Sequence, residues 1–248
     1  MSIHALLLRL DAPLISFGAP MTDHIGCVQR MPALSMLTGL FANALGYTHG
    51  DAHRLNALQN RLRIAARTDR SGSPIVDYQI VDLGQPWMDA RSNGWTTRGR
   101  IMMRAGGNSS GLHIRQRHFL ADSVHTVAVT LAQPGDKPTV DDLAASLQMP
   151  ARPLFIGRKT CLPASPLFLR LTVAEDLLCA LVEEPRHARS DSGSLPAWWD
   201  EGSDESVASS PARDIATTDE RDWQNQVHTG RRLLREGLID PPIVAGHG

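Results

Sequence analysis

Hydrophobic and polar positions follow two different periods in the first two thirds of the chain. Around residues 34–45 the apolar side chains recur every three or four positions, with Pro32 near the start and Gly46 after the end, which predicts an amphipathic helix. Residues 123–131 are rich in Val and Thr and predict a strand. Further strands are expected at 3–10, 63–67, 77–83, 154–156 and 167–173, and further helices at 55–62, 140–147 and 231–238.

The order of these elements indicates an α+β fold. Apart from the short helix at 55–62, the order is β, α, β, β, a loop, β, α, β, which is compatible with a ferredoxin-like sandwich that carries a long insertion and a C-terminal extension. Residues 185–220 are rich in Ser, Asp, Glu, Arg and Pro, so a long surface excursion that is partly disordered is expected there.

The composition fits a protein with a real core. The chain has 248 residues, of which 42% are hydrophobic, and no run is long and apolar enough to span a membrane. The N-terminus lacks the features of a secretory signal, and three widely spaced cysteines fit a reducing cytoplasm better than a disulfide framework or a zinc site. There is no Walker A, HExxH, CxxC or GxSxG motif, so a cytoplasmic protein without metal or cofactor is expected.

Charge is distributed unevenly although the net charge is only −1. Residues 1–170 hold 18 Lys and Arg against 11 Asp and Glu, whereas residues 171–248 hold 7 against 15. This asymmetry predicts a basic half that binds a polyanion and an acidic C-terminal half.

The strongest local feature lies between Ala90 and Ala121, where there is no carboxylate. A glycine-punctuated basic stretch of this kind favours phosphate binding, because the guanidinium fork matches phosphate oxygens. Trp95, Ile101 and Met102 lie among the cations and could form an apolar hairpin tip that wedges between bases. The alternative is a solvated loop enriched in arginine by chance. The six arginines are Arg91, Arg98, Arg100, Arg104, Arg115 and Arg117.

Two smaller groups of residues could also act on RNA. Gly157, Arg158 and Lys159 follow a predicted strand and could clamp a phosphate, although an ordinary basic turn explains them equally well. His113 and His118 could serve as general acid and base in metal-independent RNA cleavage, with Lys159 stabilising the developing charge. The favoured interpretation of the histidines is that they contact phosphate or pack.

Five co-linear blocks between residues 3 and 170 resemble the CasD family, which is the family-five CRISPR-associated subunit of type I-E Cascade. The blocks read LLLRLDAPLISFGAP, PALSMLTGLFANALGY, VDYQIVDLG, RQRHFLADSVHTVAV and RPLFIGRKTCLPASPLF. The resemblance implies a ferredoxin-like domain of the RAMP type, related to the RRM fold, over residues 1–165, with a β-hairpin thumb at about 84–117. A small β-rich extension at 166–248, acidic and partly disordered over 185–220, would follow.

The resemblance also implies a function. Members of this family are non-catalytic subunits that hold the 5′ handle of the guide RNA (crRNA) and pack against the backbone and large subunits of the complex, which acts in antiviral defence. Target DNA would be met only through the complex, and no membrane is involved. The turn at 157–159 matches the family's Gly-Arg-(Arg/Lys), and only Ser35 remains of its Pro-Thr-(Lys/Arg)-Ser helix start.

These matches assign RNA-binding roles to residues of the thumb, the turn and the helix start. The thumb arginines, His113, the turn residues Gly157, Arg158 and Lys159, and Ser35 are expected to contact RNA. Trp95, Ile101 and Met102 are expected at the thumb tip. Two alternatives stay open. One is an endoribonuclease that cuts precursor RNA, as in type I-C relatives, and the other is a basic binding module unrelated to CRISPR.

Overall fold

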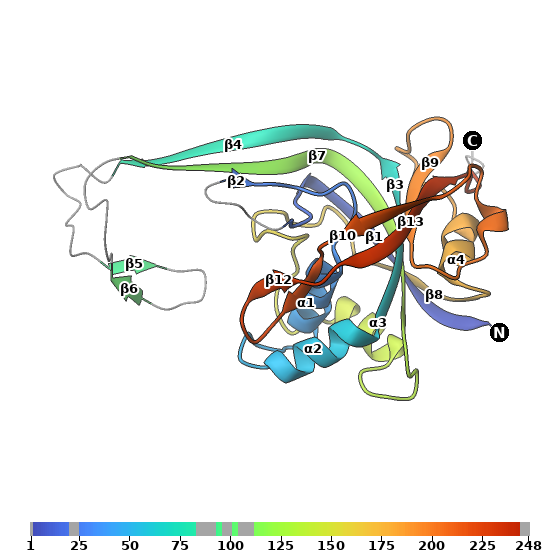
Figure 1. The fold of residues 1–248 in the computed structure, drawn as a ribbon, viewed down its shortest axis with the longest axis horizontal. Helices are drawn as coiled ribbons and strands as arrows, with labels where there is room; N and C mark the ends of the chain where they lie inside the picture. The colour runs from blue at the N-terminus through green and yellow to red at the C-terminus, as the bar shows by residue number, and fades with distance from the viewer. Residues whose placement is uncertain (1, 20–24, 83–92, 96–100, 104–111, 244–248) are drawn as a thin grey trace.

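A computed structural model shows a nine-stranded sheet with helices packed against both of its faces (Figure 1). The path through this sheet is β10-β13-β9-β3-β7-β1-β8, with β2 and β4 paired to β7 off the path. The structure describes residues 2–19, 25–82, 93–95, 101–103 and 112–243.

Four antiparallel strands form the centre of the molecule, in the order β8-β1-β7-β3. Their side chains are apolar on both faces, because layers cover both faces. In β1, Leu6 and Leu8 face one hydrophobic core, whereas Ala5 and Leu7 face the other. This explains why the N-terminal block is a continuous apolar run instead of an alternating one. The four strands are β1 (Ile3–Ile15), β3 (Leu62–Arg70), β7 (Leu112–Leu131) and β8 (Phe168–Ala174).

Three helices cover the face of the sheet to which Leu6 and Leu8 point. They are α1 (Leu34–Ala44), α2 (Ala52–Arg61) and α3 (Val140–Gln148), and all three were predicted from the sequence. Thr139 caps α3 through a capping box with Asp142. In the described part of the chain, no helix has the length and apolarity needed to cross a bilayer.

A long hairpin of β4 (Ser73–Asp82) and β7 extends away from the body of the molecule (Figure 1). Its pairing runs from Ser73 opposite Ala121 to Asp82 opposite Leu112. The short strand β2 (Ile25–Gly26) pairs in parallel with β7 at the base of this hairpin. The strands β5 (Asn93–Trp95) and β6 (Ile101–Met103) pair with each other in the segment between β4 and β7. An insertion between two strands of the sheet was predicted, and the strands on either side of it are longer than the sequence pattern indicated.

The C-terminal third is folded onto the sheet, and this corrects two predictions. The helix predicted at 231–238 is strand β13, because β9 and β10 pair with it on either side. The stretch 185–220, predicted to be partly disordered, contains β9, η1 and β10, and both strands join the main sheet. Composition alone missed this, because β9 takes its ladder from β3 and buries Trp198 and Trp199. The elements are α4 (Leu177–Glu183), β9 (Leu195–Trp199), η1 (Glu205–Val207), β10 (Arg213–Thr217), β11 (Glu220–Asp222), β12 (Val227–Thr229) and β13 (Arg232–Ile239).

The strand predicted at 154–156 is also wrong. These residues have no ladder and form part of a loop. The Ile156 N–H donates to Cys161 O at 2.8 Å, and Ile156 O accepts from Ser16 N at 3.4 Å. The loop therefore satisfies its backbone locally and against the end of β1, and a run of three apolar residues was too short to distinguish this from a strand.

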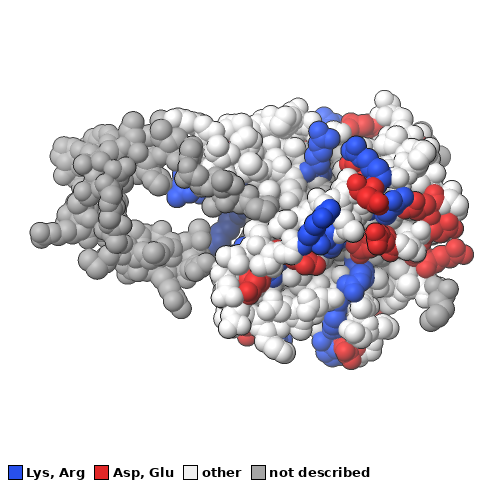
Figure 2. Space-filling model, in the orientation of Figure 1, with Lys and Arg blue, Asp and Glu red and all other residues white. Residues whose placement is uncertain are grey.

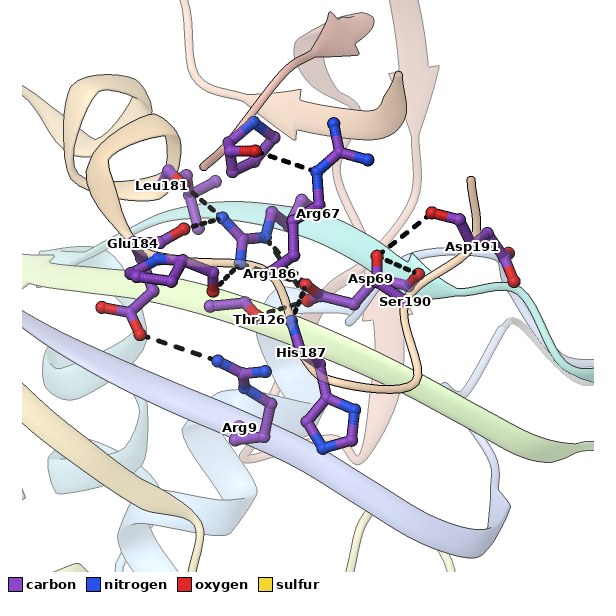
Figure 3. A network of polar contacts seen from close by, with 12 residues as sticks. Arg9, Arg67, Asp69, Thr126, Leu181, Glu184, Arg186, His187, Ser190 and Asp191 are labelled. Atoms are coloured by element: carbon purple, nitrogen blue, oxygen red, sulfur yellow. Dashed lines mark hydrogen bonds and ion pairs between the residues drawn. The ribbon is translucent and has the colours of Figure 1, made fainter. Parts of the chain in front are cut away.

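A buried polar network joins the C-terminal third to the second face of the sheet (Figure 3). Arg67 of β3 has no solvent exposure and donates to Glu184 O at 2.6 Å and Pro185 O at 2.8 Å, just past the end of α4, and also to Leu181 O inside it. Carbonyls at a helix C-terminus lack intrahelical donors, so the guanidinium acts as their cap.

Asp69 completes this network. It pairs with Arg67 at 3.0 Å and accepts from the His187 N–H at 3.1 Å and from the Thr126 hydroxyl. Burial acts to raise the pKa of Asp69, but the Arg67 charge and these hydrogen bonds hold it below the ordinary value. The start of the segment after α4 is thus held to β3 by a buried ion pair and its hydrogen bonds.

Candidate nucleic-acid interface

Most of the cations that the sequence assigned to RNA binding lie, in sequence, between the end of β4 and Ala121. Among the predicted thumb-tip residues, Trp95 pairs with Ile101 and Gly94 with Met102 in the β5–β6 backbone ladder. His113 lies on β7 opposite Val81. Arg91, Arg98, Arg100 and Arg104 lie outside the described residues. The structure therefore gives side-chain contacts only for the base of the hairpin.

Arg117 is an exposed cation at that base. In the strand ladders it lies opposite Asp77 of β4 and beside Gly26 of β2. Its guanidinium has no hydrogen bond or ion pair within the described residues. Arg115, two residues earlier, is partly buried and is engaged by a neighbour. Of the two arginines predicted at the thumb base, Arg117 is the one whose donors are available.

Arg158 holds the base of the hairpin together. Its guanidinium donates to His118 O and Gly26 O, both at 3.0 Å, and lies 4.8 Å from the centre of the Phe119 ring. It therefore joins β7, β2 and the 154–162 loop. Burial lowers the pKa of Arg158, and the nearby charge of Arg117 lowers it further. Arg158 is thus mainly a positioning residue.

Gly157 has a packing reason for being glycine. Its φ is +86°, and a Cβ there would lie 1.7 Å from Ser16 O. The sequence suggested that this glycine lets the backbone approach a phosphate. The structure shows instead that it lets the loop approach the end of β1, which sets the direction of the next two residues.

Lys159 and Ser35 meet at a cavity of about 740 Å³ between α1 and the 152–162 loop. Lys159 is exposed, and the described residues offer it no hydrogen bond or carboxylate. Ser35 is buried in the first turn of α1, so within this cavity it is a wall residue. Gly157 and Arg152 also line the cavity. The structure therefore brings together the predicted residues of the turn and of the helix start.

The N-terminus of α1 is occupied by a carboxylate from the C-terminal third. Asp219 Oδ2 accepts from the Leu34 N–H at 2.9 Å, and Asp219 O accepts from the Ser35 N–H at 2.9 Å. Arg232 binds the same carboxylate at 2.5 Å, and Asp219 is almost fully buried. Helix N-termini are ready anion sites, but this one is already filled from within the chain.

Most other Lys and Arg side chains are bound by carboxylates or carbonyls of the protein itself. Figure 2 shows Lys and Arg intermingled with Asp and Glu on the visible face of the body. In the C-terminal third, Arg213 binds Glu236, Arg232 binds Asp200 and Asp219, and Arg235 binds Glu205 and Asp214. Arg30, Arg117 and Lys159 are exposed and have no hydrogen bond or ion pair within the described residues, and in the C-terminal third the same is true of Arg231.

The two candidate catalytic histidines do not form a pair. His113 and His118 both lie on β7, five residues apart, which corresponds to about 17 Å of extended chain. A general acid and a general base acting on one phosphate must both reach that phosphate. His118 instead contributes its carbonyl to the Arg158 clamp.

Sequence reasoning missed three residues of this region. Arg30 follows β2 without a motif, and Arg152 is held by Asn43 Oδ1 at 2.8 Å and by the carbonyls that end α1. Asp219 is 185 positions from its partner Leu34. No local pattern could have identified these, because each contact depends on the tertiary fold.

Comparisons with known proteins agree on one family. A model described as CRISPR-associated protein (Cas_Cas5) matches residues 5–235. CRISPR system Cascade subunit CasD of Escherichia coli (strain K12) is 28% identical over 177 residues, which cover 71% of this chain and 75% of that protein. A chain of a CRISPR RNA-guided surveillance complex has a TM-score of 0.67 and 26% identity, covering 98% of this chain and 94% of that one. A structure titled Crystal structure of Cas protein has a TM-score of 0.62 at 22% identity, covering 98% and 100% of the two chains.

Proposed function

The chain belongs to the CRISPR-associated Cas5 family, and we propose that it is a non-catalytic RNA-binding subunit of a type I-E surveillance complex. In this proposal it caps the 5′ handle of crRNA during antiviral defence. The family match covers nearly the whole chain, and the similar proteins include a Cascade subunit and a chain of an RNA-guided complex.

The central sheet supports a ferredoxin-like fold of the RAMP type. Counting only the strands that the helices α1–α2 and α3 connect, β1, β3, β7 and β8 are the first to fourth strands, and their spatial order is fourth, first, third, second. All three neighbouring pairs are antiparallel. This is the arrangement of the β-α-β-β-α-β motif, and sheets of that kind are common platforms for RNA.

The observation that carries the proposal is that Arg117 and Lys159, both exposed and unpaired within the described residues, each adjoin a residue of the Arg158 clamp in sequence. Arg158 is fixed by two carbonyls, so the residues next to it are held in place by the backbone. Cations without carboxylate partners release solution counterions when they bind phosphates, which supplies affinity that does not depend on base sequence. The described part of the chain thus offers an RNA backbone a positioned basic strip at the hairpin base.

The same arrangement suggests how partners would be met. The β4–β7 hairpin extends away from the body, so it can reach RNA and a neighbouring backbone subunit together (Figure 1). In this proposal the large subunit binds nearby, and target DNA is met only through the assembled complex.

Co-expression tests this assignment. The chain, carrying an affinity tag, would be expressed with the backbone and large-subunit proteins and a repeat array, and small RNA in the purified complex would be sequenced. The expected result is RNA with a uniform repeat-derived 5′ end, in reduced amount after Arg117→Gln and Lys159→Gln together. Purification of the assembled proteins without such RNA would contradict the proposal.

The endoribonuclease alternative is tested by incubating the purified chain, at high excess and without metal, with repeat RNA. We expect no cleavage, because His113 and His118 are too far apart along β7 to act on one phosphate. Cleavage that His118→Ala abolishes would establish the alternative. Binding of unrelated RNA with the same affinity, together with no association with the other subunits, would favour a generic basic module.

A further inference from the structure

A second cavity lies between the hairpin base and the C-terminal strands. Its volume is about 750 Å³, within the range typical of small-molecule sites. Gly72 and Leu120 contribute from the hairpin, Trp198 and Leu238 from β9 and β13, and the segment from Val28 to Arg30 from the connection that follows β2. The α1 cavity described above shares none of these lining residues.

A buried imidazole lines this cavity with a nitrogen that has no partner. His125 of β7 is 1% exposed, and its Nδ1 lies 3.1 Å from the Thr68 hydroxyl. The ring is also held edge-on by Phe17, with centroids 4.7 Å apart. Its Nε2 is buried and unpartnered among the described residues. Such a nitrogen costs free energy unless a ligand or a water satisfies it.

A second polar atom in the wall is in the same situation. Gln29 Oε1 is buried without a hydrogen-bond donor in the described residues, while the Gln29 N–H is fixed by Phe17 O at 2.9 Å. His125 and Gln29, which both line the cavity, therefore each carry a buried polar atom without a partner, beside apolar wall residues such as Leu120. A planar heterocycle with donors and acceptors along its edge matches this combination.

The rim of the cavity favours an anion next to that heterocycle. Arg30 is exposed and unpaired in the described part of the chain, and Glu236 is already bound by Trp198 Nε1 at 3.0 Å and by Arg213 at 2.6 Å. Gly26, which the Arg158 clamp holds, is four residues from Arg30, at most about 14 Å of extended chain. Arg30 is thus tied by a short stretch of chain to the clamp that Arg117 and Lys159 adjoin.

We infer that this cavity receives one unstacked nucleobase of the bound RNA, with His125 Nε2 and Gln29 Oε1 reading its edge and Arg30 binding the adjoining phosphate. This inference rests on the proposed function, because it requires that the chain bind single-stranded RNA. It adds a site that distinguishes bases, whereas Arg117 and Lys159 contact only the backbone.

An abasic scan tests the inference. A set of RNAs with the repeat-derived handle sequence, each lacking one base, would be titrated against the assembled complex or the purified chain by fluorescence anisotropy. One abasic position should weaken binding about tenfold or more, the scale of a lost buried base contact. In Gln29→Ala and in His125→Leu the intact RNA should bind as weakly as that abasic RNA, so the abasic penalty disappears.

Two comparisons separate this inference from the proposed function. Lys159→Gln should weaken the binding of intact and abasic RNAs by the same factor, because it removes a contact to the RNA backbone.

No RNA binding by the unaltered protein would refute the proposed function itself. RNA binding with no abasic-sensitive position, or with a penalty that Gln29→Ala leaves unchanged, would overturn only the base pocket. Loss of a protein subunit from the complex on Gln29→Ala, with the abasic penalty intact, would show that the cavity holds a protein segment instead. Gln29 is outside the core, so this variant remains informative even if His125→Leu does not fold.

Discussion

The hairpin base and the C-terminal third both carry exposed arginines, but the C-terminal third pairs most of its own with carboxylates. Arg117 and Lys159 have no carboxylate partner in the described residues, whereas Arg213, Arg232 and Arg235 are each bound by one or two carboxylates. Most of the arginine charge of the C-terminal third is therefore neutralised by carboxylates of the same region. Counting charged residues along the sequence detects the acidic and basic halves, but only pairing tells which cations can bind a phosphate.

The deepest contrast is between Arg67 and Arg117. Arg67 is fully buried and fixes the end of α4, so Arg67→Ala should lower the free energy of unfolding by about 3–5 kcal/mol, because Asp69 would remain as a buried, uncompensated charge. Arg117→Ala should change it by less than about 0.5 kcal/mol. Urea denaturation followed by tryptophan fluorescence measures both. Equal losses in the two variants would remove the distinction between structural and available arginines.

Lowering the pH should destabilise the protein through His125, which lines the cavity between the hairpin base and the C-terminal strands. Burial lowers the pKa of His125 to about 4, from 6.5 for an exposed imidazole. The unfolded chain then takes up a proton that the folded chain excludes, so stability is full above pH 6.5 and is lost as the pH falls toward 4. The loss should reach about 3 kcal/mol. Urea denaturation at several pH values should show a shallower dependence in His125→Gln, and an identical dependence would contradict the buried neutral imidazole.

A third test concerns Asp219, the residue of the C-terminal third that binds the N-terminus of α1. Asp219→Ala should destabilise the protein by about 1–2 kcal/mol, since it removes the cap of α1 and leaves Arg232 with Asp200 alone. Asp219→Asn, which keeps an acceptor oxygen, should cost less. Thermal unfolding monitored by circular dichroism gives the comparison, and a larger loss in the Asn variant would argue against the cap.

The smallest effect in free energy is the one closest to function. For single-stranded RNA, Arg117→Gln and Lys159→Gln should each lower the slope of log affinity against log salt by about 0.7, one phosphate contact apiece, and weaken binding several-fold. Arg235→Gln is the control from the C-terminal third, where the guanidinium is already paired. RNA affinity measured at four salt concentrations gives the slope for each variant. An equal change in the control would mean that net charge governs binding, and not whether the cation is free of a carboxylate partner.

The local patterns were informative where an element makes most of its own contacts. The helices α1 and α3 and the strand core of β7 were all predicted, because the periodicity and propensity that specify them act within a few residues. The helix predicted at 231–238 was wrong, because strand β13 depends on β9 and β10 and not on its own propensity. The disorder predicted at 185–220 was wrong for the same reason, since β9 is ordered by β3.

The sequence by itself determined the helices α1, α2 and α3, the strands β1, β3, β4, β7 and β8, the basic stretch after β4 and the resemblance to the CRISPR-associated family. These depend on periodicity, composition and contiguous blocks, all of which are local. The tertiary structure alone decided that Arg158 is a clamp while Lys159 is available, that Asp219 fills the N-terminus of α1, and that His125 faces a cavity with an unpartnered nitrogen. Each of these follows from which distant groups share a hydrogen bond, and no spacing along the chain specifies that.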